Sequence, residues 1–203
     1  MRKFLITILL MTIFIFNSTV SYSQKYFTVE DGYAYFINHP KSKGVNFKIR
    51  IPDGWEVQEA NREPVVGKLV FDNNVFMILV EDLPTFISRE ESKEVYLSDQ
   101  YENMILNEYS SRGHNPKILS SSINYLDGYP AELIKASFSM YHPWEDKTRS
   151  YIMRSWIIIY EDLVVMLQCM SPTKNEEYIN IQSCNMAYSF VFLEDGYVSN
   201  YLK

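Results

Sequence analysis

Four runs of strand-like residues in the second half of the chain constrain its fold most. They are joined in pairs by Asp127-Gly128 and by Glu161-Asp162, connections that are too short to hold a crossover helix. Strands linked by such tight turns lie antiparallel, so this half of the chain predicts consecutive hairpins in a largely antiparallel sheet. The runs cover Ile118–Leu126, Ala131–Tyr141, Arg149–Tyr160 and Leu163–Met170.

The first half of the chain shows the same kind of pattern. Phe47, Ile49 and Ile51 alternate with charged residues, which indicates a half-buried strand closed by the turn Pro52-Asp53-Gly54. Trp55 then begins a return strand that should pair with the first, and we expect its ring to be buried at the end of the sheet. A further hairpin is predicted from Lys68–Asp72 and Val75–Glu81, and an edge strand from Tyr33–Ile37.

Two helices are predicted from capping signals. Ser88 and Glu91 have the spacing of a capping box, so one long helix should run from Ser88 to Arg112 and stop at Gly113. Thr173 and Glu176 form a second such pair, which predicts a helix that ends near Tyr188. Hairpins with helices packed on them as layers make an α+β fold, in a single domain over residues 24–203.

The N-terminus has the pattern of a secretory signal peptide over residues 1–23. Arg2 and Lys3 precede the apolar run Phe4–Phe16, which is shorter than the roughly 20 residues that span a membrane. Ser21 and Ser23 supply the small residues that signal cleavage requires, so the mature chain should begin near Gln24 and be periplasmic or secreted. The alternative is an uncleaved N-terminal anchor.

The charge of the mature chain limits its partners. Removal of residues 1–23 leaves 17 Lys and Arg against 25 Asp and Glu, a formal charge of −8. Nucleic acids and anionic lipids favour proteins with clustered basic residues. We therefore expect no nucleic-acid partner and no stable membrane insertion after cleavage.

The two cysteines are predicted to remain unpaired. Cys169 lies near the end of a strand, whereas Cys184 lies about 16 Å along the following helix at 1.5 Å per residue, beside Met166 or Leu167. Cys184 also falls on the side of that helix opposite its main apolar stripe. A disulfide in an exported protein is the alternative.

Three short motifs resemble the PsbP-like family. They are the stretch from Phe47 through Pro52-Asp53-Gly54-Trp55, the strand entry Gly128-Tyr129-Pro130-Ala131, and Ser189-Phe190 after the last predicted helix. The resemblance implies an α/β/α sandwich with a largely antiparallel sheet flanked by helices. It also implies a mostly non-catalytic class of proteins, which includes photosystem accessory subunits, import-factor relatives and exported bacterial proteins. It implies no site, because the metal-binding residues of the photosynthetic members have no matching motif here.

The sequence contains no catalytic or metal-binding motif that we can identify. His39, His114 and His142 each lie in a predicted loop near a proline, and none has a second ligand at metal spacing. A serine-nucleophile elbow, a glycine-rich phosphate loop and a paired-cysteine redox motif are all missing from the sequence. We therefore expect no metal, no cofactor and no enzymatic activity, with a pair of carboxylates as the mechanism left open.

The loop from Tyr141 to Arg149 has the composition of a binding site. It places Trp144 among polar residues, with Tyr141, His142 and Arg149 beside it, and Trp, Tyr and Arg dominate binding hot spots. The alternative is that the Trp144 ring folds back over the sheet end as a plug.

Together these patterns favour a non-catalytic accessory or protein-interaction module of the bacterial cell envelope, with an unknown envelope protein as its partner. The alternative is a small-ligand-binding protein or weak hydrolase with a pocket between sheet and helix. A pocket lined by several polar side chains would favour that alternative.

Overall fold

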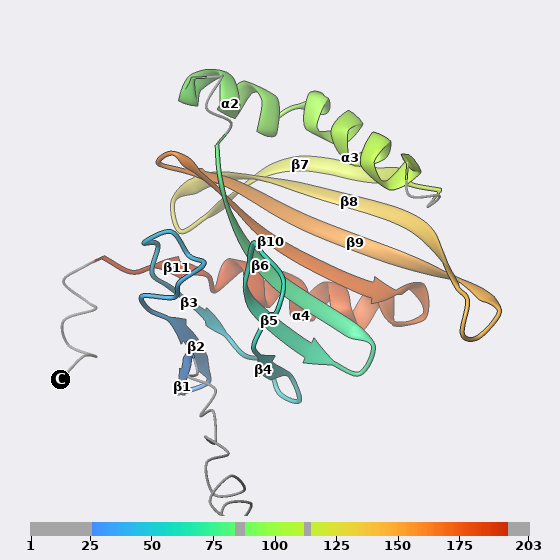
Figure 1. The fold of residues 1–203 in the computed structure, drawn as a ribbon, viewed down its shortest axis with the longest axis horizontal. Helices are drawn as coiled ribbons and strands as arrows, with labels where there is room; N and C mark the ends of the chain where they lie inside the picture. Colours follow the sequence, from blue (N-terminus) through green and yellow to red (C-terminus); the bar gives the residue numbers. More distant parts are fainter. Residues whose placement is uncertain (1–25, 84–87, 112–114, 195–203) are drawn as a thin grey trace, which may run out of the picture.

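The computed structural model describes residues 26–83, 88–111 and 115–194. The predicted signal peptide and the predicted helix stop at Gly113 lie outside the described residues. The chain forms two antiparallel sheets and three helices within that part (Figure 1). The larger sheet has the order β4 (Glu56–Gln58), β5 (Val65–Phe71), β6 (Asn74–Asp82), β10 (Leu163–Pro172), β9 (Lys147–Tyr160), β8 (Tyr129–His142), β7 (Lys117–Leu126). The smaller has the order β1 (Thr28–Glu30), β2 (Tyr33–Phe36), β3 (Phe47–Arg50), β11 (Val191–Phe192).

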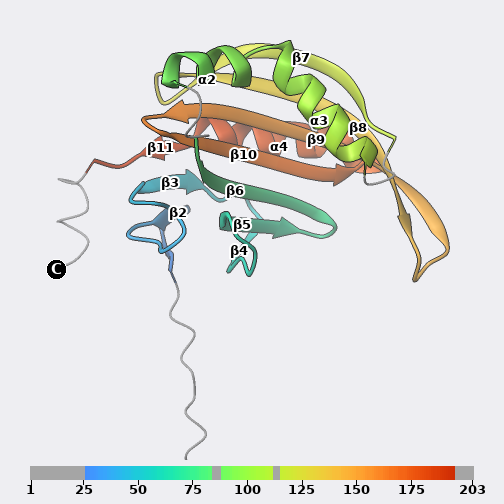
Figure 2. The same cartoon turned by 45° about the horizontal axis from the view of Figure 1, so that its top comes forward.

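Helices cover both faces of the seven-stranded sheet, as the sandwich prediction requires. Helices α2 (Arg89–Tyr96) and α3 (Asp99–Ser111) lie over one face, and α4 (Glu176–Tyr188) lies behind the other (Figures 1 and 2). The four-stranded sheet packs on the same side as α4. The α+β fold class predicted from the order of strands and helices is therefore confirmed.

The main core fills the space between the two sheets and α4. Its largest side chains come from all three layers, and each is almost inaccessible to solvent. Phe36 and Phe47 come from the smaller sheet, Phe76 and Trp156 from the larger, and Phe190 from the residues after α4. A second core lies under α2 and α3 and contains Ile105, Phe138 and Met153 among others.

Strand β9 lies inside the larger sheet, between β10 and β8, and its sequence explains why. Every residue from Tyr151 to Ile159 is buried, because α2 and α3 cover one face of the sheet and α4 covers the other. A strand that is buried on both faces has a continuous apolar run, which this segment supplies except at Arg154 and Ser155. The edge strand β7 is by contrast largely exposed and contains three consecutive serines.

The two predicted hairpin turns in this half of the chain are present. Asp127 and Gly128 have φ values of 49° and 80°, which is the left-handed pair that a two-residue hairpin turn of primed type requires. Leu126 pairs with Tyr129 directly across that turn. Tyr160 likewise pairs with Leu163, with Glu161 at φ 52° between them.

Two expectations for the first half of the chain were wrong. The turn Pro52-Asp53-Gly54 does not close a hairpin, because β3 belongs to the smaller sheet and β4 to the larger. The turn instead carries the chain from one sheet to the other, and Trp55 is buried where it enters the larger sheet, stacked on Phe71. The strand predicted at Tyr33–Ile37 is not an edge strand, since β1 pairs with its free side.

The long helix predicted from Ser88 to Arg112 is two helices. The capping box of Ser88 and Glu91 is present, with the Glu91 N–H donating to Ser88 Oγ at 3.2 Å. The helix ends at Tyr96, however, and Ser98 begins the second one by accepting hydrogen bonds from Gln100 and Tyr101. A serine competes with the helical ladder for backbone donors, which explains the break.

The second predicted capping box does not form. Thr173–Asn175 adopt a 3₁₀ turn, and α4 starts at Glu176 with no side-chain cap. The carboxylate of Glu176 bonds instead to Lys135 of β8 and lies 3.6 Å from the Arg154 guanidinium of β9. The helix start is therefore fixed by the sheet beneath it.

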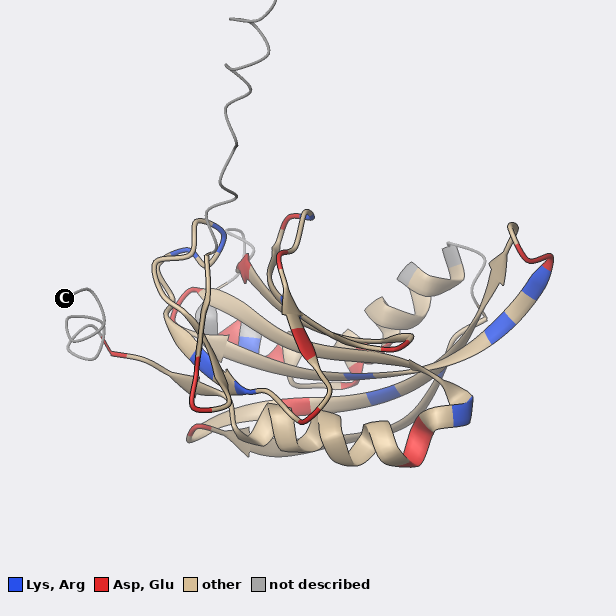
Figure 3. Ribbon diagram, turned by 90° about the horizontal axis from the view of Figure 1, so that it is seen from below, with Lys and Arg blue, Asp and Glu red and all other residues tan. Residues whose placement is uncertain are grey.

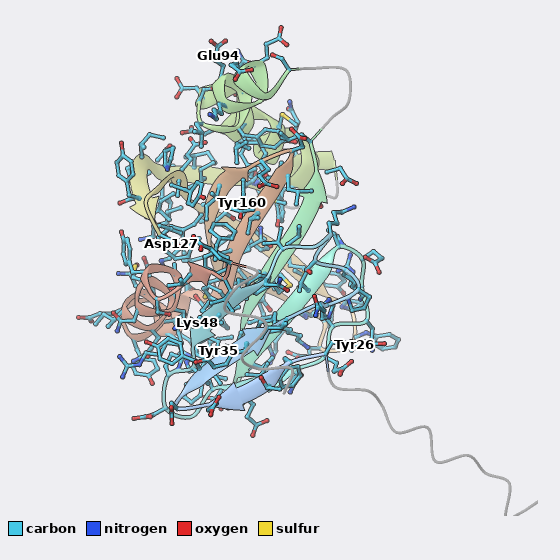
Figure 4. All side chains as sticks on the ribbon, turned by 90° about the vertical axis from the view of Figure 1, so that its left-hand side faces the viewer. Tyr26, Tyr35, Lys48, Glu94, Asp127 and Tyr160 are labelled. Carbon is cyan, nitrogen blue, oxygen red and sulfur yellow. The ribbon has the colours of Figure 1, made fainter. Side chains whose placement is uncertain are left out.

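The chain after α4 is tied to both sheets. Strand β11 pairs with β3, and the Phe192 N–H donates to the carboxylate of Asp127 at 2.9 Å. The Phe192 ring stacks on Tyr160 at 4.0 Å between centroids. Asp127 and Tyr160 are labelled in Figure 4. The same view labels Lys48 and Tyr35 of the smaller sheet, where the Lys48 ammonium lies 5.8 Å from the centroid of the Tyr35 ring.

Candidate functional site

The hairpin of β8 and β9 extends beyond the rest of the larger sheet. Strand β7 pairs with β8 only as far as Ser137, and β10 pairs with β9 only from Tyr151 onwards. Residues 139–142 and 147–150 therefore pair only with each other, as a two-stranded ribbon (Figures 1 and 2). The predicted binding residues all lie in this ribbon or its turn, which together with the adjoining pair Phe138 and Tyr151 we call the hairpin tip (residues 138–151).

Strand register divides the predicted residues between the two faces of the ribbon. Arg149 pairs with Met140, and His142 lies two residues further along on the same face. Tyr141 pairs with Thr148 on the opposite face. The structure thus brings His142 and Arg149 together but separates Tyr141 from them.

Three of the four predicted residues are held by bonds within the tip. The Tyr141 hydroxyl donates to Asp146 at 2.7 Å, and Tyr151 Oη lies 2.8 Å from His142 Nε2. Arg149 donates to Glu145, and this hydrogen bond lowers the pKa of the Glu145 carboxyl. Figure 3 shows the resulting mixture of acidic and basic residues at the end of the hairpin.

Trp144 is the exception, because its side chain is 96% exposed. No described residue hydrogen-bonds to it or stacks on it. The alternative that this ring plugs the end of the sheet is therefore wrong. A two-stranded ribbon holds the turn away from the core, so the ring has no apolar surface to fold onto.

A groove of about 750 Å³ lies between the larger sheet and helices α2 and α3. Its floor is the sheet face formed by β6, β10, β9 and β8, its wall is formed by α2 and α3, and residues 62–65 close one end. This volume is within the range of small-molecule sites. Six methionines, three tyrosines and Gln168 are prominent among its lining side chains. The methionines are Met77, Met104, Met140, Met153, Met166 and Met170, and the tyrosines are Tyr96, Tyr101 and Tyr109.

The methionines are segregated to this groove. Six of the seven in the described part of the chain line it, and only Met186 of α4 lies elsewhere. The opposite face of the same sheet has Phe, Ile, Val, Leu and Trp side chains at the corresponding strand positions. Methionine is flexible and polarisable, and it is frequent on surfaces that adapt to what they bind.

Hydrogen bonds orient two of these sulfurs. The Tyr101 hydroxyl donates to Met166 Sδ at 3.3 Å, and the Tyr109 hydroxyl donates to Met153 Sδ at 3.2 Å. Gln168 also donates to Met153 Sδ, at 3.2 Å, and to Ser155 Oγ. Helix α3 and the sheet floor are thereby connected through the methionines.

Sequence analysis did not identify the groove. The detectable signal is the alternation Met166-x-Gln168-x-Met170, which places three adaptable or polar side chains on one face of β10. The intervening Val165, Leu167 and Cys169 face α4 and the core. The strand alone does not show that a helix covers only part of its methionine face.

Two buried charges lie on opposite faces of the sheet. Arg154 faces α4, where its Nε donates to Asn180 at 2.7 Å. Glu132 faces α3, is 1% exposed and accepts a hydrogen bond from Ser121 at 3.0 Å. Burial raises the pKa of Glu132 to about 6, with Glu102 and Asp99 as further acidic neighbours.

Both cysteines are free thiols in the structure, with Cys169 buried and Cys184 half-buried. Ile181 and Tyr188, which lie three residues before and four residues after Cys184 on α4, are more than half exposed. Burial raises the pKa of Cys169 to about 12.

Among the described residues, no group of three or more His, Cys, Asp or Glu could hold a metal ion. None of the described helices is long and apolar enough to cross a membrane.

No family model matches the sequence, and no curated protein matches it significantly. Among solved structures, 26 chains match significantly. Several of these, including the following two, are similar to this chain at TM-scores below 0.5. One is LpqN of Mycobacterium tuberculosis, which is involved in cell envelope biogenesis. The match has 14% sequence identity and a TM-score of 0.48, and it covers 74% of this chain and 84% of that chain. The other is the Ran-binding protein Mog1p of Saccharomyces cerevisiae. The match has 11% sequence identity and a TM-score of 0.45, and it covers 71% of this chain and 88% of that chain.

The match to cyanobacterial PsbP from Synechocystis sp. PCC 6803 is structurally stronger. It covers 82% of this chain and 95% of that chain with a TM-score of 0.57, at 7% sequence identity. An identity this low shows a shared fold and nothing about a shared activity. The resemblance predicted from the Pro52-Asp53-Gly54-Trp55 and Gly128-Tyr129-Pro130-Ala131 motifs is confirmed at that level, and the protein has a PsbP-like fold.

Proposed function

We propose that this protein is a non-catalytic interaction module of the bacterial cell envelope, which binds a protein partner through its hairpin tip. The observation that supports this most is the 96% exposure of Trp144. A large apolar ring in water is unfavourable, and Trp is the residue most enriched in binding hot spots. A partner that covers this ring would gain its full burial.

The tip is ordered before a partner arrives. Bonds between Tyr141 and Asp146 and between Arg149 and Glu145 hold the two strands on either side of the turn. A preordered site loses less conformational entropy when it binds. The same bonds occupy the ionisable groups of the tip in structural contacts, which supports a binding role over a catalytic one.

The charge at the tip favours a protein over a membrane surface. Glu145 and Asp146 follow Trp144 in the turn and are balanced by Lys147 and Arg149, and the mature chain is acidic overall. A tip without a basic cluster has no electrostatic attraction to an anionic lipid surface. A polar protein surface with an apolar pocket matches this mixture of charges.

Site-specific photo-crosslinking in the envelope of the source bacterium tests the proposal. A photoreactive phenylalanine derivative replaces Trp144, and in a control protein it replaces Ile181, which is 53% exposed on α4. We expect a discrete protein adduct from position 144 and none from position 181. Excess wild-type protein should compete for the partner, whereas excess Trp144→Ala protein should not.

Equal adducts from the two positions, or equal competition by wild type and Trp144→Ala, would contradict the proposal. Flotation with vesicles of phosphatidylethanolamine and phosphatidylglycerol tests the membrane alternative. Association that depends on Trp144 would assign the tip to lipid instead of protein.

A further inference from the structure

The methionine-lined groove has the dimensions of a site for one elongated molecule. It runs from Val65 of β5 across β6, β10 and β9 to Met140 of β8. Four spacings between neighbouring strands amount to about 19 Å at ~4.8 Å each. The floor is half-buried at Met77, Leu79 and Met166, so helices α2 and α3 leave part of the sheet face accessible.

The groove can accommodate a hydrocarbon chain better than a peptide. A bound peptide needs partners for its backbone N–H and C=O groups. The floor strands β6, β10 and β9 already use theirs in pairing with neighbours on both sides. Gln168 is likewise engaged with Met153 and Ser155. A hydrocarbon chain makes no such demand and gains from contact with thioether side chains.

One end of the groove carries a free positive charge. Arg62 lines it and is exposed, and no described carboxylate pairs with its guanidinium. The neighbouring Glu63 carboxylate lies 3.9 Å from Lys41 Nζ, so that acidic group is partly neutralised. Glu81 of β6 also lines the groove, and it is engaged in an interaction of its own. A guanidinium at the mouth of an apolar groove is complementary to a carboxylate head group.

We infer that this groove binds one long-chain fatty acid, with its hydrocarbon chain along the methionine floor and its carboxylate at Arg62. The groove reaches Met140 of the hairpin tip but is not lined by Trp144. A ligand there deepens the ligand-binding alternative that the sequence left open. Flexible methionines allow the floor to follow chains of different shape, so we expect selectivity for chain length and charge and little selectivity for unsaturation.

Calorimetric titration of the mature protein with palmitate, below its critical micelle concentration, tests the inference. We expect a 1:1 complex that is at least about a hundredfold tighter than the octanoate complex, since each buried methylene adds to affinity. Palmitamide is the neutral probe. Arg62→Gln should weaken palmitate binding about tenfold and leave palmitamide binding unchanged.

A matched pair of variants locates the site. Met104 on α3 is 50% exposed and lines the groove, and Ile181 on α4 is 53% exposed and lies on the other side of the molecule. Met104→Glu should lower palmitate affinity at least tenfold, because it places a carboxylate in the wall. Ile181→Glu should bind palmitate like wild type.

Palmitate that binds no more tightly than octanoate, or equally to Met104→Glu and wild type, would overturn the inference. Equal losses of palmitate and palmitamide in Arg62→Gln would overturn the placement of the head group. Silver ion tests the remaining occupant, a soft metal held by thioethers. Stoichiometric silver binding that is lost when Met153 and Met170 become leucine, without fatty-acid binding, would assign the groove to a metal.

Discussion

Phe36 of the smaller sheet packs directly over Gly67 of the larger one. A Cβ atom placed on Gly67 would lie 2.7 Å from Cζ of the Phe36 ring and 2.9 Å from its Cε1. Phe36 cannot move aside easily, because it is fully buried and stacks on Phe47 at 5.0 Å. The missing side chain at Gly67 thus sets how closely the two sheets approach.

Gly67→Ala should therefore destabilise the protein by about 1–3 kcal/mol, the usual range for overpacking a core. Urea unfolding followed by circular dichroism measures this. The double variant Gly67→Ala, Phe36→Leu should lose less unfolding free energy than the sum of the losses in the two single variants, because the smaller side chain relieves the clash. Strict additivity would mean that the two residues do not meet.

Trp144→Ala should leave the free energy of unfolding within about 0.5 kcal/mol of the wild-type value, as for other exposed positions. Its side chain is 96% exposed and has no described partner in the fold. Thermal and urea unfolding of the purified variant measure this. A loss of several kcal/mol would show that the ring contributes to the core.

Trp55→Ala should have the opposite result and cost about 3–5 kcal/mol, the range for removing a large buried aromatic ring. The ring is 5% exposed and lies 5.9 Å from Phe71 between centroids. Trp55→Phe is the control, since it keeps an aromatic ring on Phe71 and should recover most of the loss. Comparable stability of Trp55→Ala and wild type would contradict the packing described above.

Glu132 makes stability depend on pH in a defined window. Its pKa rises to about 6 on folding from an ordinary value of 4.5, so the folded state retains the proton more strongly. The contribution of this group to the free energy of unfolding is fully present below pH ~4.5. It is lost as the pH rises through about 6, and the loss is at most about 2 kcal/mol. Glu132→Gln should therefore raise stability at pH 7.5 and change little at pH 4.

The pH dependence is measured as unfolding free energy for wild type and Glu132→Gln between pH 4 and 8. The difference between the two proteins should grow between pH 4.5 and 6 and then level off. Glu94→Gln on the exposed face of α2 is the control (Figure 4). A constant difference across the range would mean that Glu132 titrates normally in the folded state.

Intact mass analysis after alkylation without reductant tests the state of the cysteines. In denaturant, both Cys169 and Cys184 should be modified. In native protein, Cys169 should resist modification, because burial keeps its pKa at about 12 and shields the sulfur from reagents. A pair that stays unmodified in denaturant until reductant is added would show a disulfide.

The sequence predicted the parts of the fold that depend on local pattern. The β7–β8 and β9–β10 hairpins follow from alternation and turn residues, and the Ser88 capping box follows from two side chains three residues apart. The split into two sheets does not follow from local pattern, because a turn such as Pro52-Asp53-Gly54 fits a hairpin and a passage between sheets equally well. Packing between the two sheets, such as that of Phe36 against Gly67, decides between them.

The candidate site was predictable to a similar degree. Trp144 could be identified because no periodicity gave it a place in the core. Arg149 and His142 were expected to be available to a partner, but Glu145 and Tyr151 bind them within the tip. The methionine groove depends on strands far apart in sequence and on helices that cover only part of a face, which a one-dimensional pattern cannot show.

The segregation of methionine to one side of the sheet has a chemical consequence in an oxidising compartment. Oxidation turns an apolar thioether into a polar sulfoxide. The six methionines of the groove would carry most of that change, whereas the core between the two sheets and α4 contains only Met186. Oxidative damage would therefore alter what the groove can bind, and the packing of α2 and α3 around Met153, before it affected the main core between the two sheets and α4.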